Sequence, residues 1–268
     1  MTTATASHTH RSSSSGGYGF RQVARMEWIK LRSQRYPLWT LVAMSAVMVG
    51  IGVLTGHNAP RHDPSGYDPT NAGLAGLAIA QLVVGVLGVL MITGEYSSGL
   101  IRATFAAVPK RRLVLAAKIV IFGTGTLVLG EILAFITFFA MRLSLPAGVP
   151  HPAFGQPGVL RAVIMAGVYL CLVGLIGMGI GTIVRNTAVA ISVLVALLFV
   201  LSIVLLALPH HVSYPVGKFL PVIIAENSLT AVAHDSPALP VWAGLGMMCL
   251  YTAVLLGAGG WLLARRDA

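Results

Sequence analysis

Charged side chains are scarce in this chain. Of its 268 residues only 10% are charged, whereas 56% are hydrophobic, and the mean hydropathy is +0.83. A soluble domain carries roughly 25% charged residues, which help to cover its surface with polar groups. So few charges cannot cover a globular surface of this size. The composition therefore excludes an ordinary soluble domain and indicates a protein whose solvent is lipid.

Cysteine is almost absent as well. Cys171 and Cys249 both lie inside apolar runs, where cysteine behaves as a small hydrophobic residue. Two cysteines exclude a disulfide framework and the spacing of a zinc site. The histidines lie in the N-terminal tail or in predicted loops, at His8, His10, His57, His62, His151, His210, His211 and His234. We therefore expect no metal site.

Three motifs of hydrolytic enzymes are missing. The chain contains no G-x-x-x-x-G-K-[ST] phosphate loop, no H-E-x-x-H and no G-x-S-x-G. It also has no polar segment long enough to form a soluble domain that could host such a motif. We expect a chain with no enzymatic activity of its own and no bound cofactor.

The sequence does contain six long apolar segments. Each has 19 to 24 residues, and about 20 residues are needed to cross the hydrocarbon core of a bilayer. They do not alternate between polar and apolar residues, as the strands of a membrane barrel would. The pattern predicts an all-α membrane protein with six transmembrane helices, at residues 38–56, 73–93, 119–140, 162–184, 188–208 and 241–264. Arg185, Asn186 and Thr187 predict a tight turn between the fourth and fifth helices.

The positions of the 18 Lys and Arg residues predict the orientation of these helices. Fourteen lie on one side: Arg11, Arg21, Arg25, Lys30, Arg32, Arg35, Arg102, Lys110, Arg111, Arg112, Lys118, Arg185, Arg265 and Arg266. Only Arg61, Arg142, Arg161 and Lys218 lie on the other. Because Lys and Arg collect in cytoplasmic loops, both termini are expected in the cytoplasm, in a multi-pass protein of the inner (cytoplasmic) membrane. The net charge of +10 forms no continuous basic face, so no nucleic-acid partner is expected.

Two segments precede the first span, which opens the six-helix domain at residues 37–268. Residues 1–19 are rich in Ser, Thr, His and Gly and lack the apolar core of a signal peptide, which predicts a disordered polar tail. Residues 20–36 predict an interfacial amphipathic helix that contacts the lipid bilayer and that Pro37 ends. Its apolar arc contains Phe20, Val23, Ala24, Trp28 and Leu31, is interrupted by Glu27, and has Arg21, Arg25 and Arg32 beside it. The alternative is a solvated basic tail that only orients the protein.

The connection at residues 94–112 is longer and chemically more mixed than a hairpin needs. It predicts a cytoplasmic loop with a short helix at residues 97–107, capped by one of the serines at its start and stopped by Pro109. Glu95 at the membrane edge needs a partner. Arg102 would share its face if the helix were continuous. Apolar side chains on this protruding helix favour a cytoplasmic docking partner.

The same connection carries a resemblance to a known family. It contains Glu95-Tyr-Ser-Ser-Gly99, then Arg102, then Pro109-x-Arg111 and Lys118. This series resembles the signature of the permease subunits of ATP-binding-cassette (ABC) exporters of the ABC-2 type. The predicted surface helix, the six spans and the long external segment before the sixth span extend the resemblance from Phe20 to the C-terminus. Leu100 departs from it, since many relatives have Thr or Met at that position.

The resemblance implies partner chains and a mechanism. An ABC ATPase subunit would bind ATP-Mg, a second permease would complete a homodimer or heterodimer, and the substrate would cross by alternating access. The implied ATPase-coupling residues are Glu95, Arg102, Pro109, Lys110, Arg111 and Arg112. The cations by themselves are equally well explained as orientation signals. Residues 209–240 would form short half-helices of an external gate. The alternatives are a stand-alone secondary transporter and a membrane protein that transports nothing.

Polar and small residues inside the spans suggest two further sites. Glu131 lies near the middle of the third span, where a carboxylate costs about 2.5–3.5 kcal/mol on insertion scales. We therefore expect Glu131, with Thr124 on the same face, to line a transport pathway or to form an interhelical hydrogen bond. Gly177 and Gly181 form the small-x-x-x-small pattern of close helix packing.

Overall fold

The structure, a computed structural model, describes residues 19–33, 36–60, 67–231 and 239–265. Within these ranges, six helices are long and apolar enough to cross a membrane, which agrees with the predicted number of spans. The spans comprise α2 (Tyr36–His57), α4 (Leu77–Ser97), α6 (Arg111–Ser144), α7 (Val159–Val184), a fifth helix in three parts, and α12 (Val241–Arg265). The parts of the fifth are α8 (Thr187–Val195), the π-helical η1 (Ala196–Val200) and α9 (Leu201–Leu206). The predicted tail and the predicted positions of Arg11, Arg35, Arg61 and Arg266 lie outside the described residues.

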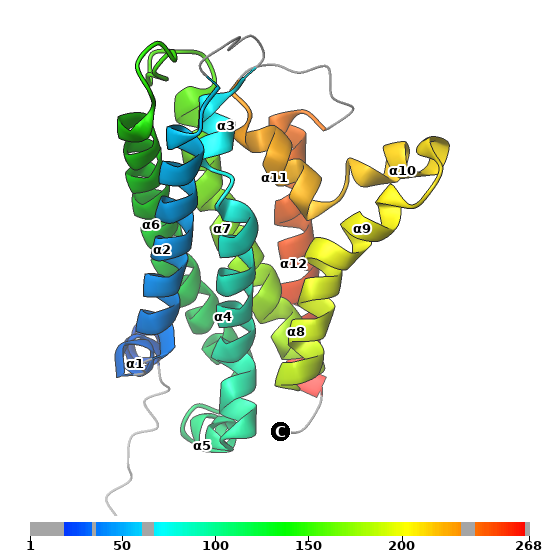
Figure 1. The fold of residues 1–268 in the computed structure, drawn as a ribbon. Coiled ribbons are helices and arrows are strands. Elements are labelled where there is room, and N and C mark those ends of the chain that lie inside the picture. Colours follow the sequence, from blue (N-terminus) through cyan, green and yellow to red (C-terminus); the bar gives the residue numbers. More distant parts are fainter. Residues whose placement is uncertain (1–18, 34–35, 61–66, 232–238, 266–268) are drawn as a thin grey trace, which may run out of the picture.

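Shorter helices occupy the two ends of the bundle (Figure 1). One end, called the α1 end, carries α1 (Phe20–Ser33) and α5 (Leu100–Ala107). The opposite end, called the α3 end, carries α3 (Pro69–Gly73), α10 (His210–Gly217) and α11 (Pro221–Leu229). The last two are short helices in the segment where half-helices are expected.

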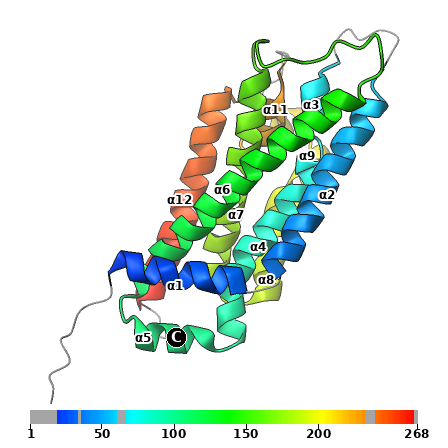
Figure 2. The same ribbon diagram turned by 90° about the vertical axis from the view of Figure 1, so that its left-hand side faces the viewer.

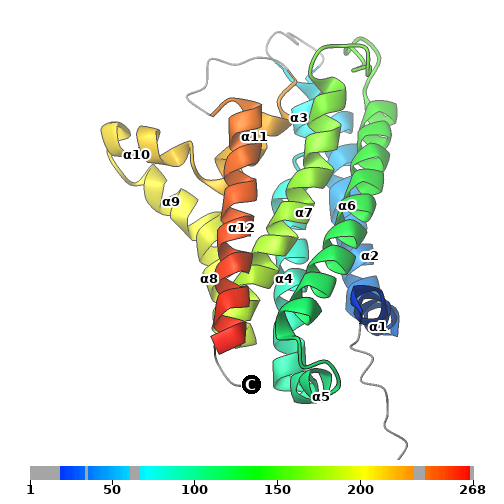
Figure 3. The same ribbon diagram turned by 180° about the vertical axis from the view of Figure 1, so that it is seen from behind.

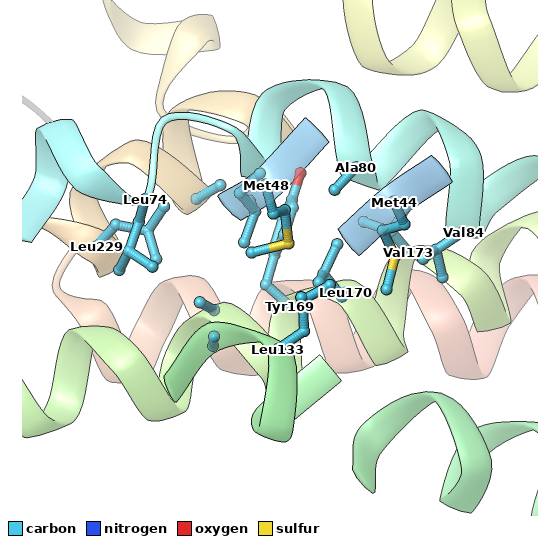
Figure 4. Close-up of a cluster of buried hydrophobic side chains, with 14 of the residues drawn as sticks. Met44, Met48, Leu74, Ala80, Val84, Leu133, Tyr169, Leu170, Val173 and Leu229 are labelled. Atoms are coloured by element: carbon cyan, nitrogen blue, oxygen red, sulfur yellow. The ribbon is translucent and has the colours of Figure 1, made fainter. Parts of the chain in front are cut away.

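Helix α7 is the centre of the bundle. Of its most apolar window 78% is buried, against 56% for α4 and 17–28% for the other spans. It packs against α4, α6 and α12, and Tyr169 on α7 donates a hydrogen bond to Gln81 on α4. Tyr169 and Leu170 lie among Met44, Met48 and other apolar side chains in the buried cluster of Figure 4.

The outer faces of the bundle are apolar. Trp39 on α2 is 72% exposed and Trp242 on α12 is 69% exposed, and large aliphatic residues are exposed on every span. A folded protein in water rarely shows so extensive an apolar surface. Together with the helix lengths, this surface makes the chain a multi-pass membrane protein whose spans are surrounded by lipid.

Several helix boundaries differ from those expected, and three of the differences have a clear cause or consequence. The second span begins at Leu77, not at residue 73, because Asp68 caps the separate helix α3 before it. The third span begins at Arg111, not at residue 119, so α6 has 34 residues and is about 50 Å long. The helix at residues 20–36 ends at Ser33, and Pro37 lies in the first turn of α2, where proline fits without loss of a hydrogen bond.

The tight turn between α7 and α8 has the geometry that its position requires. Arg185 adopts a left-handed backbone conformation with φ of 59°, and Asn186 caps α8 by accepting a hydrogen bond from the backbone N–H of Val189. The Arg185 guanidinium lies 5.2 Å from the centre of the Tyr96 ring. The turn therefore also joins α7 to the α1 end of α4.

At the α3 end, Asp68 joins two parts of the chain. One carboxylate oxygen accepts hydrogen bonds from the backbone N–H groups of Thr70 and Asn71, at 2.9 and 3.1 Å. The other accepts from the N–H of Ala231, just after α11, at 2.6 Å. Arg161 on α7 donates to the Thr230 carbonyl at 2.6 Å. These bonds hold the segment after α11 against α3 and α7.

Candidate functional site: a buried ion cluster beneath α1

Four charged side chains meet at the α1 end of the bundle and form what we call the ion cluster: Glu27, Lys30, Glu95 and Lys118. Lys118 Nζ lies 2.6 Å from Glu27 Oε2 and 2.8 Å from Glu95 Oε1. Lys30 Nζ lies 3.2 Å from Glu27 Oε1 and 3.0 Å from Glu95 Oε1. Lys30 also donates to Thr104 Oγ1 at 3.0 Å. Each carboxylate therefore contacts both ammonium groups.

The ion cluster is buried and electrically balanced. The side chains of Glu27, Lys118 and Glu95 are 1%, 2% and 8% exposed, and that of Lys30 is 22% exposed. Two carboxylates face two ammonium groups, so the four side chains of the ion cluster carry no net charge together. Balance matters here, because an unpaired buried charge is destabilising by several kcal/mol. Glu95 Oε2 is buried without a hydrogen-bond partner among the described residues, which leaves room for one more donor.

Four helices contribute to this site. Glu27 and Lys30 are one turn apart on α1, so they point the same way, and Val23 one turn earlier is buried beside them. Glu95 lies in the last turn of α4, Lys118 lies near the start of α6, and Thr104 is a buried residue of α5. Figure 2 shows α1 lying across the bundle beside α6, with α5 beneath it. The ion cluster thus joins α1 and α5 to the spans α4 and α6.

The predicted pairing of Glu95 with Arg102 is wrong. Glu95 pairs with Lys118 and Lys30, whereas Arg102 is exposed and makes no ion pair with it among the described residues. The physical reason is Gly99, whose left-handed backbone (φ of 71°) interrupts the helix between the two residues. Accordingly α5 begins at Leu100, not at residue 97. Ser97 and Ser98 donate to the Gly94 carbonyl instead of capping α5.

The buried face of α1 also differs from the expected one. The structure buries Val23 and Glu27, the residue thought to interrupt the apolar arc, while Trp28 is 50% exposed. Arg21, Arg25 and Arg32 are exposed as well. Glu27 faces the bundle because Lys118 of α6 lies there and forms an ion pair with it. The exposed face combines aromatic side chains with arginines.

The other residues of the connection form a basic surface at the same end. An open depression is lined by Pro109, Lys110, Arg111, Arg112, Leu113, Ala116 and Ala264. Lys110 and Arg112 are exposed, like Arg102 on α5. Arg111 instead donates to the Leu263 carbonyl at 3.3 Å and lies 5.4 Å from the centre of the Phe105 ring. Arg111 therefore joins α6 to α12 and α5, while the other cations point outward.

Glu131 lies at the crossing of α6 and α7. A Cβ built on Gly167 of α7 would lie 2.5 Å from the Glu131 carboxyl carbon, so the side chain rests directly on that glycine. Glu131 Oε2 is buried and has no hydrogen-bond partner among the described residues, so both expectations for this residue, the interhelical hydrogen bond and the transport pathway, stay predictions. Thr124 is exposed on the outer face of α6 and does not contact Glu131 by a hydrogen bond. The two side chains therefore form no joint site in this arrangement.

Gly177 and Gly181 face α4. A Cβ on Gly177 would lie 2.1 Å from the Gly85 carbonyl oxygen, and one on Gly181 would lie 3.0 Å from the Val89 carbonyl oxygen. A side chain at Gly177 would therefore collide with the backbone of α4. The glycines let the two central helices approach within backbone contact.

Sequence reasoning missed the pair of Glu27 with Lys118. A signal was present, because an acid on an apolar helix face and a lysine at the start of an apolar span both need a partner of opposite charge.

Compared with known proteins, the chain matches no family model and no curated protein sequence. Among the described residues, no group of three or more His, Cys, Asp or Glu side chains could hold a metal ion.

Proposed function

We propose that this chain is the permease subunit of an ABC exporter of the ABC-2 type, in the cytoplasmic membrane and with both termini in the cytoplasm. The observation that carries the proposal is the ion cluster. It joins α1 and α5, on the side with the basic surface, to the spans α4 and α6. The connection that resembles the family signature, residues 94–112, supplies Glu95 and Thr104 to this site.

The ion cluster would act as a mechanical link. Pulling α1 away from α4 and α6 would separate buried opposite charges, which is costly, so a force on α1 moves these spans with it. Helix α5 is joined to the same cluster by the hydrogen bond from Lys30 to Thr104. In the proposed mechanism a separate ATPase subunit binds ATP-Mg and closes. Its motion pushes on α1 and α5, and the bundle changes the side on which its pathway is open. In this proposal the nucleotide site lies on the ATPase subunit.

The exposed cations supply a docking surface for that ATPase. Arg102, Lys110 and Arg112 point outward at the α1 end, where an acidic surface could pair with them. Such charges at an interface rim raise association rates and select partners. Arg111 would serve the same contact indirectly, by holding α5, α6 and α12 together behind the surface.

Helix α1 is proposed to lie at the lipid–water boundary. Its exposed face carries Phe20, Trp28 and Ile29 next to Arg21 and Arg25. Aromatic side chains suit the headgroup region, and arginines pair with anionic lipids. The arrangement therefore supports an interfacial helix over a solvated tail.

A second permease, identical or related, is proposed to complete the transporter. Helices α9 and α10 lean away from the rest of the bundle, as Figures 1 and 3 show from opposite sides, whereas α8 packs against α4 and α7. Val193 on α8 and Ile203 on α9 are exposed, so this face presents apolar side chains to a neighbour or to lipid. The short helices α10 and α11 would form the external gate of such a pair.

The experiment is a pull-down of the detergent-solubilised chain, with mass spectrometry of the proteins that accompany it. The docking variant carries Lys110→Glu and Arg112→Glu, which reverses two exposed charges without touching the ion cluster. The matched control carries Arg142→Glu and Lys218→Glu at the α3 end. We expect an ABC ATPase with the wild type and the control, and a loss of most of it with the docking variant.

The outcomes separate the possibilities. Recovery of the intact chain without any ABC ATPase, under conditions that preserve other membrane complexes, would refute the proposed function. Equal recovery with all three forms would retain the transporter class and refute the docking surface.

A proton-coupled secondary transporter is the second candidate, and Glu131 favours it. An acid within a span, with one buried and unpartnered oxygen, is the kind of group that carries protons in such transporters. Purified chain in liposomes would then transport under a proton gradient without any ATPase. Glu131→Gln would abolish that transport, whereas it would leave ATP-driven transport intact.

A further inference from the structure

An apolar groove lies between α2, α4 and α6, next to α1. Its walls include Leu41 and Met44 of α2, Val84 and Leu87 of α4, and Phe122 and Leu129 of α6. Figure 2 shows α2 and α6 close together at the α3 end and separated toward the α1 end, with α4 behind them. None of the residues of the ion cluster lines the groove, so it is a separate site.

The shape of the groove follows from how α2 and α6 cross. At the α3 end they touch: a Cβ on Gly56 of α2 would lie 2.6 Å from the Met141 carbonyl oxygen of α6. At the α1 end they have diverged, and a Cβ on Gly125 of α6 would meet nothing within 4 Å. Gly125 lines the groove, so the open space at this glycine belongs to it. The divergence leaves a wedge between two spans.

The chemistry of the walls selects an apolar occupant. Among the described residues, the only polar side chains that line the groove are Thr40 and Thr126. Thr40 donates to the Pro37 carbonyl and Thr126 to the Phe122 carbonyl, both within their own helices. The groove spans residues 122–129 of α6, which is about 10 Å along the helix axis, roughly a third of the hydrocarbon core. It therefore offers a hydrocarbon chain a place within one leaflet.

The end of the groove nearest α1 points to the headgroup. Leu31 of α1 lines that end, and the next residue, Arg32, is exposed. Arg25, two turns earlier on α1, is exposed as well. An exposed cation next to a residue that lines the end of an apolar groove attracts a lipid with a negatively charged headgroup. We propose that the groove binds one acyl chain of an anionic phospholipid whose phosphate pairs with Arg32.

This lipid site does not depend on an ATPase partner, so it can be tested apart from the proposed function. The full chain, with any partner that accompanies it, is washed free of lipid in mild detergent and mixed with phosphatidylglycerol or phosphatidylcholine. Native mass spectrometry counts the lipids that remain bound. We expect one tightly bound phosphatidylglycerol on the wild type. Arg32→Ala is expected to lower the preference for phosphatidylglycerol over phosphatidylcholine about fivefold.

A leucine at residue 125 would extend into the groove, because Gly125 lines it and nothing lies within 4 Å of the Cβ position there. Gly125→Leu is expected to weaken lipid binding about tenfold. This is the effect of displacing about two methylene groups of the acyl chain from the groove. The matched control is Gly246→Leu on α12, where a Cβ also meets nothing within 4 Å. Thr126→Leu is a second groove-filling variant. Thermal unfolding of each purified variant verifies that it is folded.

Three results would overturn the site. The first is unchanged lipid binding by both groove-filling variants when they are folded. The second is equal binding of phosphatidylglycerol and phosphatidylcholine by the wild type. The third is detergent in the groove that neither lipid displaces.

Discussion

Removing Lys118 is the most informative perturbation of the ion cluster. In Lys118→Met, the carboxylates of Glu27 and Glu95 would share the ammonium group of Lys30 alone. One negative charge would then be left uncompensated at a site where both carboxylates are less than a tenth exposed. Loss of one partner from a buried ion pair costs about 3–5 kcal/mol. We expect the free energy of unfolding to fall by that amount.

The double variant tests the charge balance itself. Glu27→Gln leaves one surplus positive charge and should be destabilising on its own. Glu27→Gln combined with Lys118→Met leaves only the pair of Glu95 and Lys30, at 3.0 Å, which is balanced again. The double variant should therefore lose less stability than the sum of the two single variants, by about 1–3 kcal/mol.

The assay is unfolding of the detergent-solubilised protein by added sodium dodecyl sulfate, followed by circular dichroism. Arg102→Met is the matched control, because Arg102 is an exposed cation of the same end and pairs with neither carboxylate. It should leave the unfolding curve where it is. A Lys118→Met variant as stable as this control would refute the ion cluster, and so would strictly additive losses in the double variant.

Further predictions concern helix packing and the α3 end, and the same unfolding assay checks each of them. Gly177→Ala should lower the free energy of unfolding by about 1–3 kcal/mol, because the added methyl group would clash with the backbone of α4. Gly257→Ala should raise it by up to about 1 kcal/mol, because a Cβ at Gly257 has no atom within 4 Å and alanine favours the helix. Gly167→Ala should be destabilising, because its Cβ would lie 2.5 Å from the Glu131 carboxyl carbon and 2.8 Å from the Glu131 backbone nitrogen. Adding Glu131→Ala removes only the side-chain clash, so the double variant should recover part of the lost stability; a double variant as unstable as the sum of the single variants would contradict that contact. Asp68→Ala should cost about 0.5–2 kcal/mol through the lost cap of α3 and the lost hydrogen bond from the Ala231 N–H.

The number of spans follows from the sequence alone. A helix in lipid satisfies its backbone within about 20 residues and must be apolar along all of them, so composition and length identify it without any knowledge of neighbours. The turn at Arg185 and Asn186 also follows from the sequence alone, because two spans in series are too long to cross the bilayer as one helix. Where a polar residue ends an apolar run, the argument is weaker. Lys118 made the third span look shorter than it is, because a lysine ends an apolar run unless it has a partner.

Those partners are what the tertiary structure decides. Lys118 meets Glu27, which is 91 residues away in the chain, and Lys30 meets Glu95 across 65 residues. The pattern of charges shows that each of these residues needs an opposite charge, but several candidates satisfy that need, and Arg102 was one of them. The choice depends on the break at Gly99 and on the side of α6 against which α1 lies. Both are properties of packing in three dimensions, because the free energy of a buried charge depends on which groups surround it in space.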